Sequence, residues 1–287
     1  MPALEMLFLV FSSASLYVAG MILNDVFDAD IDLIERPHRP IPSRRINSRS
    51  AFLAGVSLLL SGIVLAAIAG WLVGPNSISS LLRPTGIAIT LAIFILLYDG
   101  WLKKTRLAPA LMGGCRTLNL LLGASTIDDS QQAVGEWLGF SGLVWWVAIS
   151  LGVYVTGITM FARKEAVFNQ NRGPLITAAL VVGIGILGMA FVNFVRPAGT
   201  GVESSMKTMF PLIIGLIGLP IFRRIAAALA HPTPLGIQTA VVTCLRSIII
   251  LDAALCFMFA PQQPLFALTV VGLLIPALLL GRWLSPT

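Results

Sequence analysis

Charged side chains are scarce in this chain. Only 11% of its 287 residues are Asp, Glu, Lys or Arg, whereas 57% are hydrophobic and the mean hydropathy is +0.91. A soluble domain of ordinary composition carries about 25% charged residues, so this composition excludes such a domain. The net charge of +6 would suggest nucleic acid as a partner of a soluble chain, but here the basic residues must first be assigned to the sides of a membrane. We therefore expect an integral membrane protein in contact with the lipid bilayer and no nucleic-acid partner.

Histidine and cysteine are also rare. The two histidines, His38 and His231, lie beside prolines without metal-ligand spacing, and the three cysteines fall within apolar segments. Buried cysteines of this kind behave as small hydrophobic residues, which argues against a zinc site or a disulfide framework. No glycine-rich nucleotide motif stands out among the 26 glycines. Glycines scattered through apolar segments suit close contacts between helices.

Long apolar runs dominate what is present. A transmembrane helix needs about 20 predominantly apolar residues. Nine apolar segments of suitable length occur, near residues 3–23, 50–73, 84–102, 107–126, 143–165, 174–195, 208–227, 236–260 and 264–284. We therefore predict an all-α fold, a polytopic transmembrane bundle of about nine helices, which forms a single domain over residues 1–287.

Basic residues gather on one side of the predicted membrane. Fourteen of them follow the odd-numbered segments, whereas only Arg83, Arg196 and Lys207 follow the even-numbered ones. Cytoplasmic loops carry the excess of Lys and Arg in membrane proteins. The pattern predicts a multi-pass protein, most simply of a bacterial-type inner membrane, whose basic side faces the cytoplasm.

The densest polar run covers residues 24–45. Asp25, Asp28 and Asp32 recur at i, i+3 and i+7, so on one helix the three carboxylates would share a face. Such like charges repel unless a cation lies between them. Oxygen ligands suit Mg²⁺, which takes one or two protein carboxylates and completes its shell with water and phosphate oxygens. A solvated connecting loop is the alternative, but a connector does not require three carboxylates aligned at a membrane boundary.

A second polar cluster, residues 163–169, ends the fifth apolar segment and therefore falls on the same side of the membrane as the first. Glu165 and Asn169 are spaced i, i+4 and share a helical face. Glu165 can ligate a metal ion, whereas the neutral Asn169 is a weaker ligand. The alternative is a basic cap, Arg163 and Lys164, whose side chains extend towards the interface beside an incidental glutamate.

Further polar residues lie between the two clusters. Arg116 and Asn119 share a face of the fourth segment, and a buried arginine is costly unless it pairs with an anion, so we favour an inward-facing role for both. Lys103 stands one turn beyond Asp99, where an ion pair between them and a phosphate contact by Lys103 are both open interpretations.

The residues Asn-Asp-x-x-Asp-x-x-x-Asp, followed by Arg-Pro-x-Arg-Pro-Ile-Pro-Ser, occupy positions 24–43. They resemble the first aspartate-rich motif of the UbiA superfamily of intramembrane prenyltransferases. The motif is most similar to those of chlorophyll synthases and archaeal geranylgeranylglyceryl phosphate transferases. In that family a second Asp-x-x-x-Asp stands where this chain has Glu165 and Asn169. The first motif there follows the second span, so we expect that this chain begins on the family's second span.

The resemblance implies Mg²⁺-dependent transfer of a prenyl group from an isoprenyl diphosphate to an aromatic or hydroxyl-bearing lipophilic acceptor within the membrane. Neutralising the charge of the leaving diphosphate allows the allylic C–O bond to break. The metal ligands implied are Asp25, Asp28, Asp32, Glu165 and Asn169, of which the four carboxylates are the catalytic groups. The diphosphate contacts implied are Asn24, Arg39, Ser43, Lys103, Lys104, Arg116, Asn119, Arg163 and Lys164. Tyr154 and Phe161 are expected to line the prenyl pocket, where their ring faces can stabilise a carbocation.

Two other hypotheses stay open. Because Asn169 replaces the second carboxylate, the chain could be a catalytically altered or inactive relative that binds or hands over isoprenoid lipids. A multispan transporter instead predicts ionisable residues near mid-span, and only Arg116 and the pair Arg246 and Asp252 approach that position.

Overall fold

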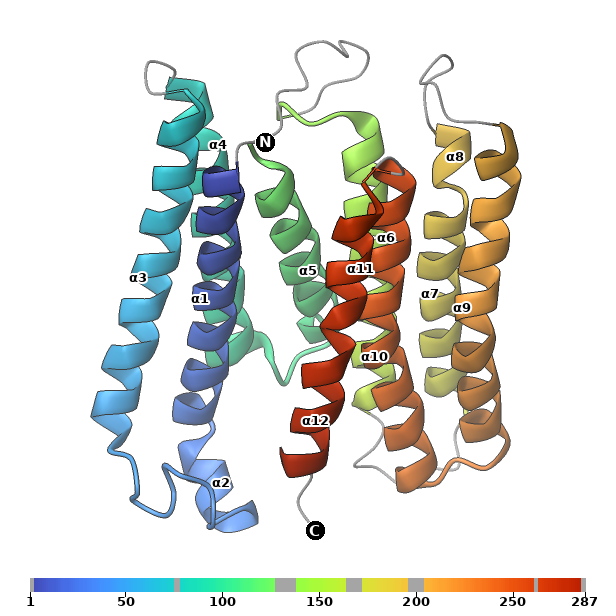
Figure 1. Ribbon diagram of the computed structural model, residues 1–287. Coiled ribbons are helices and arrows are strands. Elements are labelled where there is room, and N and C mark those ends of the chain that lie inside the picture. The colour runs from blue at the N-terminus through green and yellow to red at the C-terminus, as the bar shows by residue number, and fades with distance from the viewer. Residues whose placement is uncertain are drawn as a thin grey trace. The chain divides into compact units, whose positions relative to one another are not determined.

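The computed structural model describes residues 3–74, 78–126, 138–163, 172–195, 204–260 and 263–284. Within these ranges every regular element is a helix. The chain divides into two compact units, Met1–Gly152 and Val153–Thr287 (Figure 1). That the chain forms a single domain over residues 1–287 stays a prediction.

The first unit begins with α1 (Ala3–Phe27), the short α2 (Ala29–Glu35) and α3 (Ser48–Val73). It continues with α4 (Ile78–Leu97), the five-residue π-helix η1 (Tyr98–Leu102), α5 (Ala108–Ala124) and the first half of α6 (Gly142–Ala162). Local sequence signals place several helix starts. The side chain of Asn47 caps α3 by accepting a hydrogen bond from the backbone N–H of Arg49 at 2.9 Å, and Pro109 stands in the first turn of α5.

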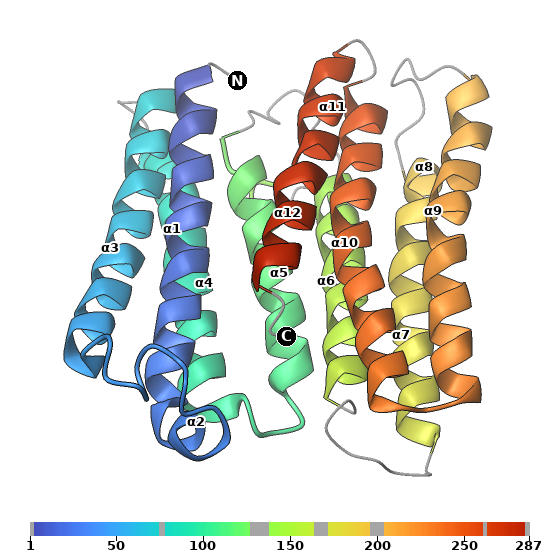
Figure 2. The same cartoon turned by 60° about the horizontal axis from the view of Figure 1, so that its bottom comes forward.

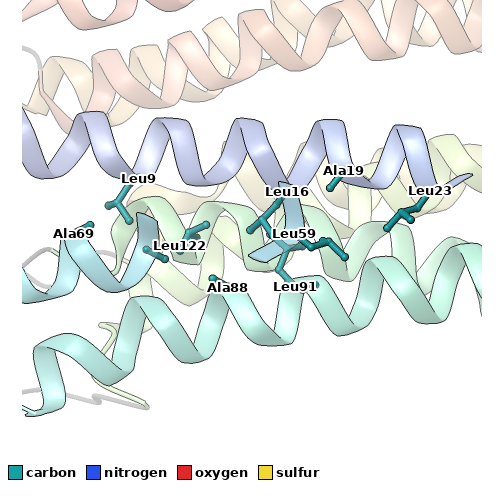
Figure 3. Close-up of a cluster of buried hydrophobic side chains, with 11 residues drawn as sticks. Leu9, Leu16, Ala19, Leu23, Leu59, Ala69, Ala88, Leu91 and Leu122 are labelled. Carbon is teal, nitrogen blue, oxygen red and sulfur yellow. The ribbon is translucent and has the colours of Figure 1, made fainter. Parts of the chain in front are cut away.

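Leucine and alanine side chains fill the space between the helices of the first unit (Figure 3). Leu16 and Leu23 of α1 are completely buried in a cluster that also includes Leu59 of α3, Leu91 of α4 and Leu122 of α5. Small residues also allow the backbones of neighbouring helices to approach each other closely. At Gly70 of α3, a Cβ atom would lie only 2.4 Å from the carbonyl oxygen of Ser80 in α4. Nearer the polar residues, Gly20 of α1 faces Ile95 of α4, where a Cβ atom on Gly20 would lie 3.1 Å from Cγ2 of Ile95.

The second unit contains the rest of α6, α7 (Gly173–Ala190), α8 (Val192–Val195) and α9 (Ser204–Ala230). It ends with α10 (Pro234–Phe259), α11 (Pro264–Gly272) and α12 (Leu274–Leu284). Helices α7 and α9 run side by side (Figures 1 and 2). Tyr154 of α6 is buried and its hydroxyl donates a hydrogen bond to the carbonyl oxygen of Cys244 in α10 at 2.9 Å. Gly185 of α7 permits a close contact with α6, because a Cβ atom there would lie 2.6 Å from the backbone nitrogen of Tyr154.

The all-α membrane fold is confirmed. Each of the nine apolar segments coincides with a helix or with two consecutive helices. Among the described residues, seven helices are long and apolar enough to cross a membrane, namely Leu4–Phe27, Ser48–Val73, Ile78–Leu102, Gly142–Ala162, Gly173–Ala190, Thr208–Ala230 and Pro234–Phe259. The segment 107–126 gives α5, only 17 residues long, and the segment 264–284 is divided between α11 and α12, so the number nine is approximate. The protein is a multi-pass integral membrane protein.

Candidate functional site

The polar run begins inside α1, which extends four residues beyond the predicted apolar segment, and the helix ends at Phe27. Asp28 lies between α1 and α2, with φ −87° and ψ −1°. Its backbone N–H still donates to the carbonyl oxygen of Asn24 at 3.0 Å, and the N–H of Asp32 donates to that of Asp28 at 2.8 Å. The three aspartates therefore lie along two consecutive helices, α1 and α2, whose junction at Asp28 keeps hydrogen bonds of helical spacing, and their position on one face stays a prediction. The helix is interrupted at Asp28, and the carboxylates pair with two different basic residues.

Asp25 and Asp32 form the first pair, which shares the guanidinium of Arg39. The Nη1 atom of Arg39 lies 3.2 Å from Oδ1 of Asp25 and 2.7 Å from Oδ2 of Asp32. The side chain of Asp32 is only 6% exposed, whereas that of Asp25 is 48% exposed. The contact with Asp32 is the stronger one, because a charged hydrogen bond gains strength when solvent is excluded.

Asn24 and Asp28 form the second pair, which shares the ammonium of Lys103. The Nζ atom of Lys103 donates to Oδ1 of Asn24 at 2.6 Å and forms an ion pair with Oδ2 of Asp28. The π-helix η1 places Lys103 at this end of α1, since its backbone N–H donates to the carbonyl oxygen of Tyr98, five residues earlier. Among the described residues, Lys103 thus forms its ion pair across helices and not with Asp99, the partner that the sequence also allowed.

The loop of residues 36–47 folds into consecutive turns beside these pairs. The backbone N–H of Ser43 donates to the carbonyl oxygen of Arg39 at 2.9 Å, and that of Ile46 donates to Pro40 at 3.1 Å. The hydroxyl of Ser43 donates to the carbonyl oxygen of Pro40 at 3.3 Å, so in this structure it supports the loop. Arg44 adopts a left-handed conformation with φ +59°, which is uncommon for a residue other than glycine. The turns and the Arg39 ion pairs together hold the loop against the end of α1.

On α5, Asn119 joins two helices of the first unit. Its Nδ2 donates to Oγ of Ser13 in α1 at 2.9 Å, and the serine hydroxyl lies 3.1 Å from Oδ1 of the same amide. Arg116 is half-buried on the same helix, and Lys104 is exposed beside Lys103. The partner Ser13 was missed from the sequence. The adjacent serines in an otherwise apolar segment were the available signal.

The second cluster is only partly described. Arg163 is exposed directly after α6, whereas Lys164, Glu165 and Asn169 lie outside the described residues. Tyr154 and Phe161 are both buried, at 0% and 2% exposure. Tyr154 packs against α7 and hydrogen-bonds to α10 as described above, and its assignment to a prenyl pocket stays a prediction.

The residues of the first cluster suit a divalent metal ion in their chemistry. Asn24, Asp25, Asp28 and Asp32 offer oxygen ligands only, and each pair already converges on one cationic nitrogen. Within the described part of the chain, no group of three or more His, Cys, Asp and Glu side chains is arranged to hold a metal ion. A site here would therefore use one or two carboxylates and the Asn24 amide together with phosphate or water oxygens, which is the usual mode for Mg²⁺.

Comparison with known proteins identifies relatives. A family model described as the UbiA prenyltransferase family matches residues 1–230. A digeranylgeranylglyceryl phosphate synthase of Methanobrevibacter smithii is 39% identical over 179 residues, which are 60% of this chain and 60% of that protein. A protein of the same name from Ignicoccus hospitalis is 29% identical over 175 residues, which are 60% of this chain and 52% of that protein. The matched part of the chain thus spans little more than half the length of these relatives.

A solved structure is also similar. Its description concerns digeranylgeranylglyceryl phosphate synthase in membranes, and the match has a TM-score of 0.59 at 19% sequence identity. It covers 90% of this chain and 86% of that one. At this identity the likeness supports the fold alone.

Proposed function

Because this chain belongs to the UbiA prenyltransferase family, we propose that it transfers a prenyl group from an isoprenyl diphosphate to a lipophilic acceptor within the membrane. The observation that carries the proposal is the convergence of Asn24, Asp25, Asp28 and Asp32 with Arg39 and Lys103 at the end of α1. Alternating anionic oxygens and basic side chains at a membrane boundary suit a diphosphate and its counter-cations.

In this proposal, Mg²⁺ would be held at the end of α1 by Asn24, Asp25, Asp28 and Asp32, with Glu165 and Asn169 as the second set of ligands. Mg²⁺ bound there would neutralise the negative charge of the leaving diphosphate. Arg39 and Lys103 bind diphosphate oxygens, and Ser43, Lys104, Arg116, Asn119, Arg163 and Lys164 stay candidate contacts. The allylic C–O bond breaks and the diphosphate departs with the bonding pair. The acceptor hydroxyl oxygen then bonds to the allylic carbon and releases its proton to water.

For the acceptor, we propose the hydroxyl of a prenylated glycerol phosphate. The support is the name digeranylgeranylglyceryl phosphate synthase, shared by the relatives from Methanobrevibacter smithii and Ignicoccus hospitalis. An aromatic acceptor is the competing class, because the resemblance of residues 24–43 to the superfamily as a whole also allows it.

We further propose that the end of α1 and the loop of residues 36–47 face the cytoplasm. In the first unit, the segments that connect α1 to α3 and η1 to α5 carry Arg36, Arg44, Arg45, Lys103 and Arg106, and Arg49 lies in the first turn of α3. Arg83 instead lies near the start of α4. This distribution satisfies the positive-inside rule.

A second candidate function rests on one observation. Asn169 stands where the family resemblance implies a second carboxylate, so a catalytically altered or inactive relative that binds or hands over isoprenoid lipids is the alternative.

The test is an acceptor panel. Purified protein in nanodiscs receives Mg²⁺, geranylgeranyl diphosphate and either geranylgeranylglyceryl phosphate or an aromatic acceptor, and products are identified by mass spectrometry. We expect an ether product with the glycerol phosphate. Product with the aromatic acceptor alone would overturn the acceptor assignment, and saturable donor binding without product would favour the lipid-binding alternative.

A further inference from the structure

The contact between Lys103 and the end of α1 joins residues that are far apart in the sequence. The Lys103 ammonium donates to the Asn24 amide oxygen at 2.6 Å and pairs with the Asp28 carboxylate. The side chain of Lys103 is 32% exposed and that of Asp28 is 21% exposed. The contact is therefore partly exposed and not buried within the helix packing.

Lys103 and Arg39 differ in how firmly they are held. Arg39 belongs to a turn-rich loop and contacts Asp32, which is 6% exposed, with a planar guanidinium. Lys103 reaches its partners with a single nitrogen at the end of a flexible four-carbon chain, which can turn to another anion without movement of the backbone. Of the two basic residues, Lys103 is the one that can exchange partners.

The oxygens that hold Lys103 are also those that suit a divalent cation. An amide oxygen and a carboxylate that are occupied by an ammonium group cannot at the same time bind a metal ion directly at full strength, so the two cations compete. We propose that Lys103 is an exchangeable cation: it occupies the Asn24 and Asp28 oxygens, gives them up to a divalent metal ion, and then binds the donor diphosphate. This inference rests on the proposed function of the site and names the residue that couples its two ligands.

The coupling has a thermodynamic consequence. Metal binding must displace Lys103, which lowers the metal affinity, but the displaced ammonium strengthens diphosphate binding. Because linkage is reciprocal, each ligand promotes the other. Removal of the Lys103 charge should therefore strengthen metal binding in the absence of donor and weaken donor binding in the presence of metal.

The first experiment measures Mn²⁺ binding by electron paramagnetic resonance in nanodiscs, without diphosphate, for wild type, Lys103→Met and Arg106→Gln. Arg106 is an exposed basic residue three positions away, so its variant controls for the loss of one positive charge nearby. We expect Lys103→Met to bind Mn²⁺ about tenfold more tightly, within the usual range for coupled sites, and Arg106→Gln to resemble wild type. Unchanged or weaker binding by Lys103→Met, or an equal gain in Arg106→Gln, overturns the exchange.

The second experiment needs no variant. Wild-type protein is treated briefly with an amine-acylating reagent with and without Mg²⁺, and modification of Lys103 is quantified by mass spectrometry relative to its exposed neighbour Lys104. We expect Mg²⁺ to increase the relative modification of Lys103 severalfold, because the ammonium leaves its ion pair. No change or a decrease overturns the proposal. Neither experiment requires turnover, so a failure of prenyl transfer and a failure of the exchange are distinguishable.

Discussion

The contacts of Arg39 predict which of its two aspartate partners contributes more to the stability of the loop of residues 36–47. Asp32 accepts a hydrogen bond from Arg39 at 2.7 Å and its side chain is 6% exposed. Its replacement by alanine should therefore lower the free energy of loop opening by about 1.5–3 kcal/mol, the usual range for hydrogen bonds to charged groups. Asp25 contacts the same nitrogen at 3.2 Å but is 48% exposed, and such exposed pairs contribute at most about 1 kcal/mol. The two residues contact one cation but should differ in their effect on the loop.

Limited trypsin proteolysis measures this difference. The bonds after Arg44 and Arg45 are the sites in the loop, because the bonds after Arg36 and Arg39 precede prolines. Cleavage requires the turns to open, and its rate follows the population of the open loop when opening is fast. Because each 1.36 kcal/mol corresponds to a factor of ten in population, Asp32→Ala should accelerate cleavage about 10- to 150-fold, and Asp25→Ala less than about fivefold.

Both variants place alanine in a helix, so helix propensity does not separate them. Equal cleavage rates in Asp25→Ala and Asp32→Ala would refute the argument that burial of the Asp32 carboxylate determines the strength of the contact. Cleavage at wild-type rate in both would show that Arg39 does not hold the loop.

Three further predictions concern helix packing. Gly185→Ala should destabilise the protein by about 1–3 kcal/mol, because the new Cβ atom would lie 2.6 Å from the backbone of Tyr154. Gly215→Ala is the control, because a Cβ atom there would have nothing within 4 Å, and it should be neutral or stabilising. Thermal unfolding of both variants in detergent measures the difference. A double-mutant cycle of unfolding free energies with Ser13→Ala and Asn119→Ala should give a coupling energy of about 0.6–1.7 kcal/mol, because the two side chains hydrogen-bond to each other. Additive effects of the two substitutions would contradict these hydrogen bonds between α1 and α5. Tyr154→Phe should lower the free energy of unfolding by about 0.5–1.5 kcal/mol, because the hydrogen bond to α10 is lost, but should retain turnover. A large loss of turnover with unchanged stability would show that the hydroxyl acts in the reaction.

Hydropathy was sufficient to locate the described helices other than the short polar α2, because a span must satisfy its backbone hydrogen bonds internally and is therefore long and apolar. The segment 208–227 lies within the continuous helix α9 although it contains Pro211 and Pro220. The polar run at residues 24–45 was also evident, since only 11% of the residues in this chain are charged.

The pairing within that run was not predictable. Spacing placed the three aspartates on one face but gave no information about the interruption at Asp28 or about which base each carboxylate would contact. The position of Lys103 depends on the π-helix η1 and on the packing of α4 against α1, and neither is encoded in local periodicity. The role of Asn119 was likewise hidden, because its partner Ser13 lies 106 residues away in the chain.

The most direct measurement of the proposed function is the release of diphosphate from geranylgeranyl diphosphate by purified protein supplied with geranylgeranylglyceryl phosphate. We predict release that requires Mg²⁺ and that is lost in Asp28→Ala, although that variant inserts and folds. Release that persists at wild-type rate without Mg²⁺ or in Asp28→Ala would contradict the assignment of the reaction to the oxygen ligands at the end of α1.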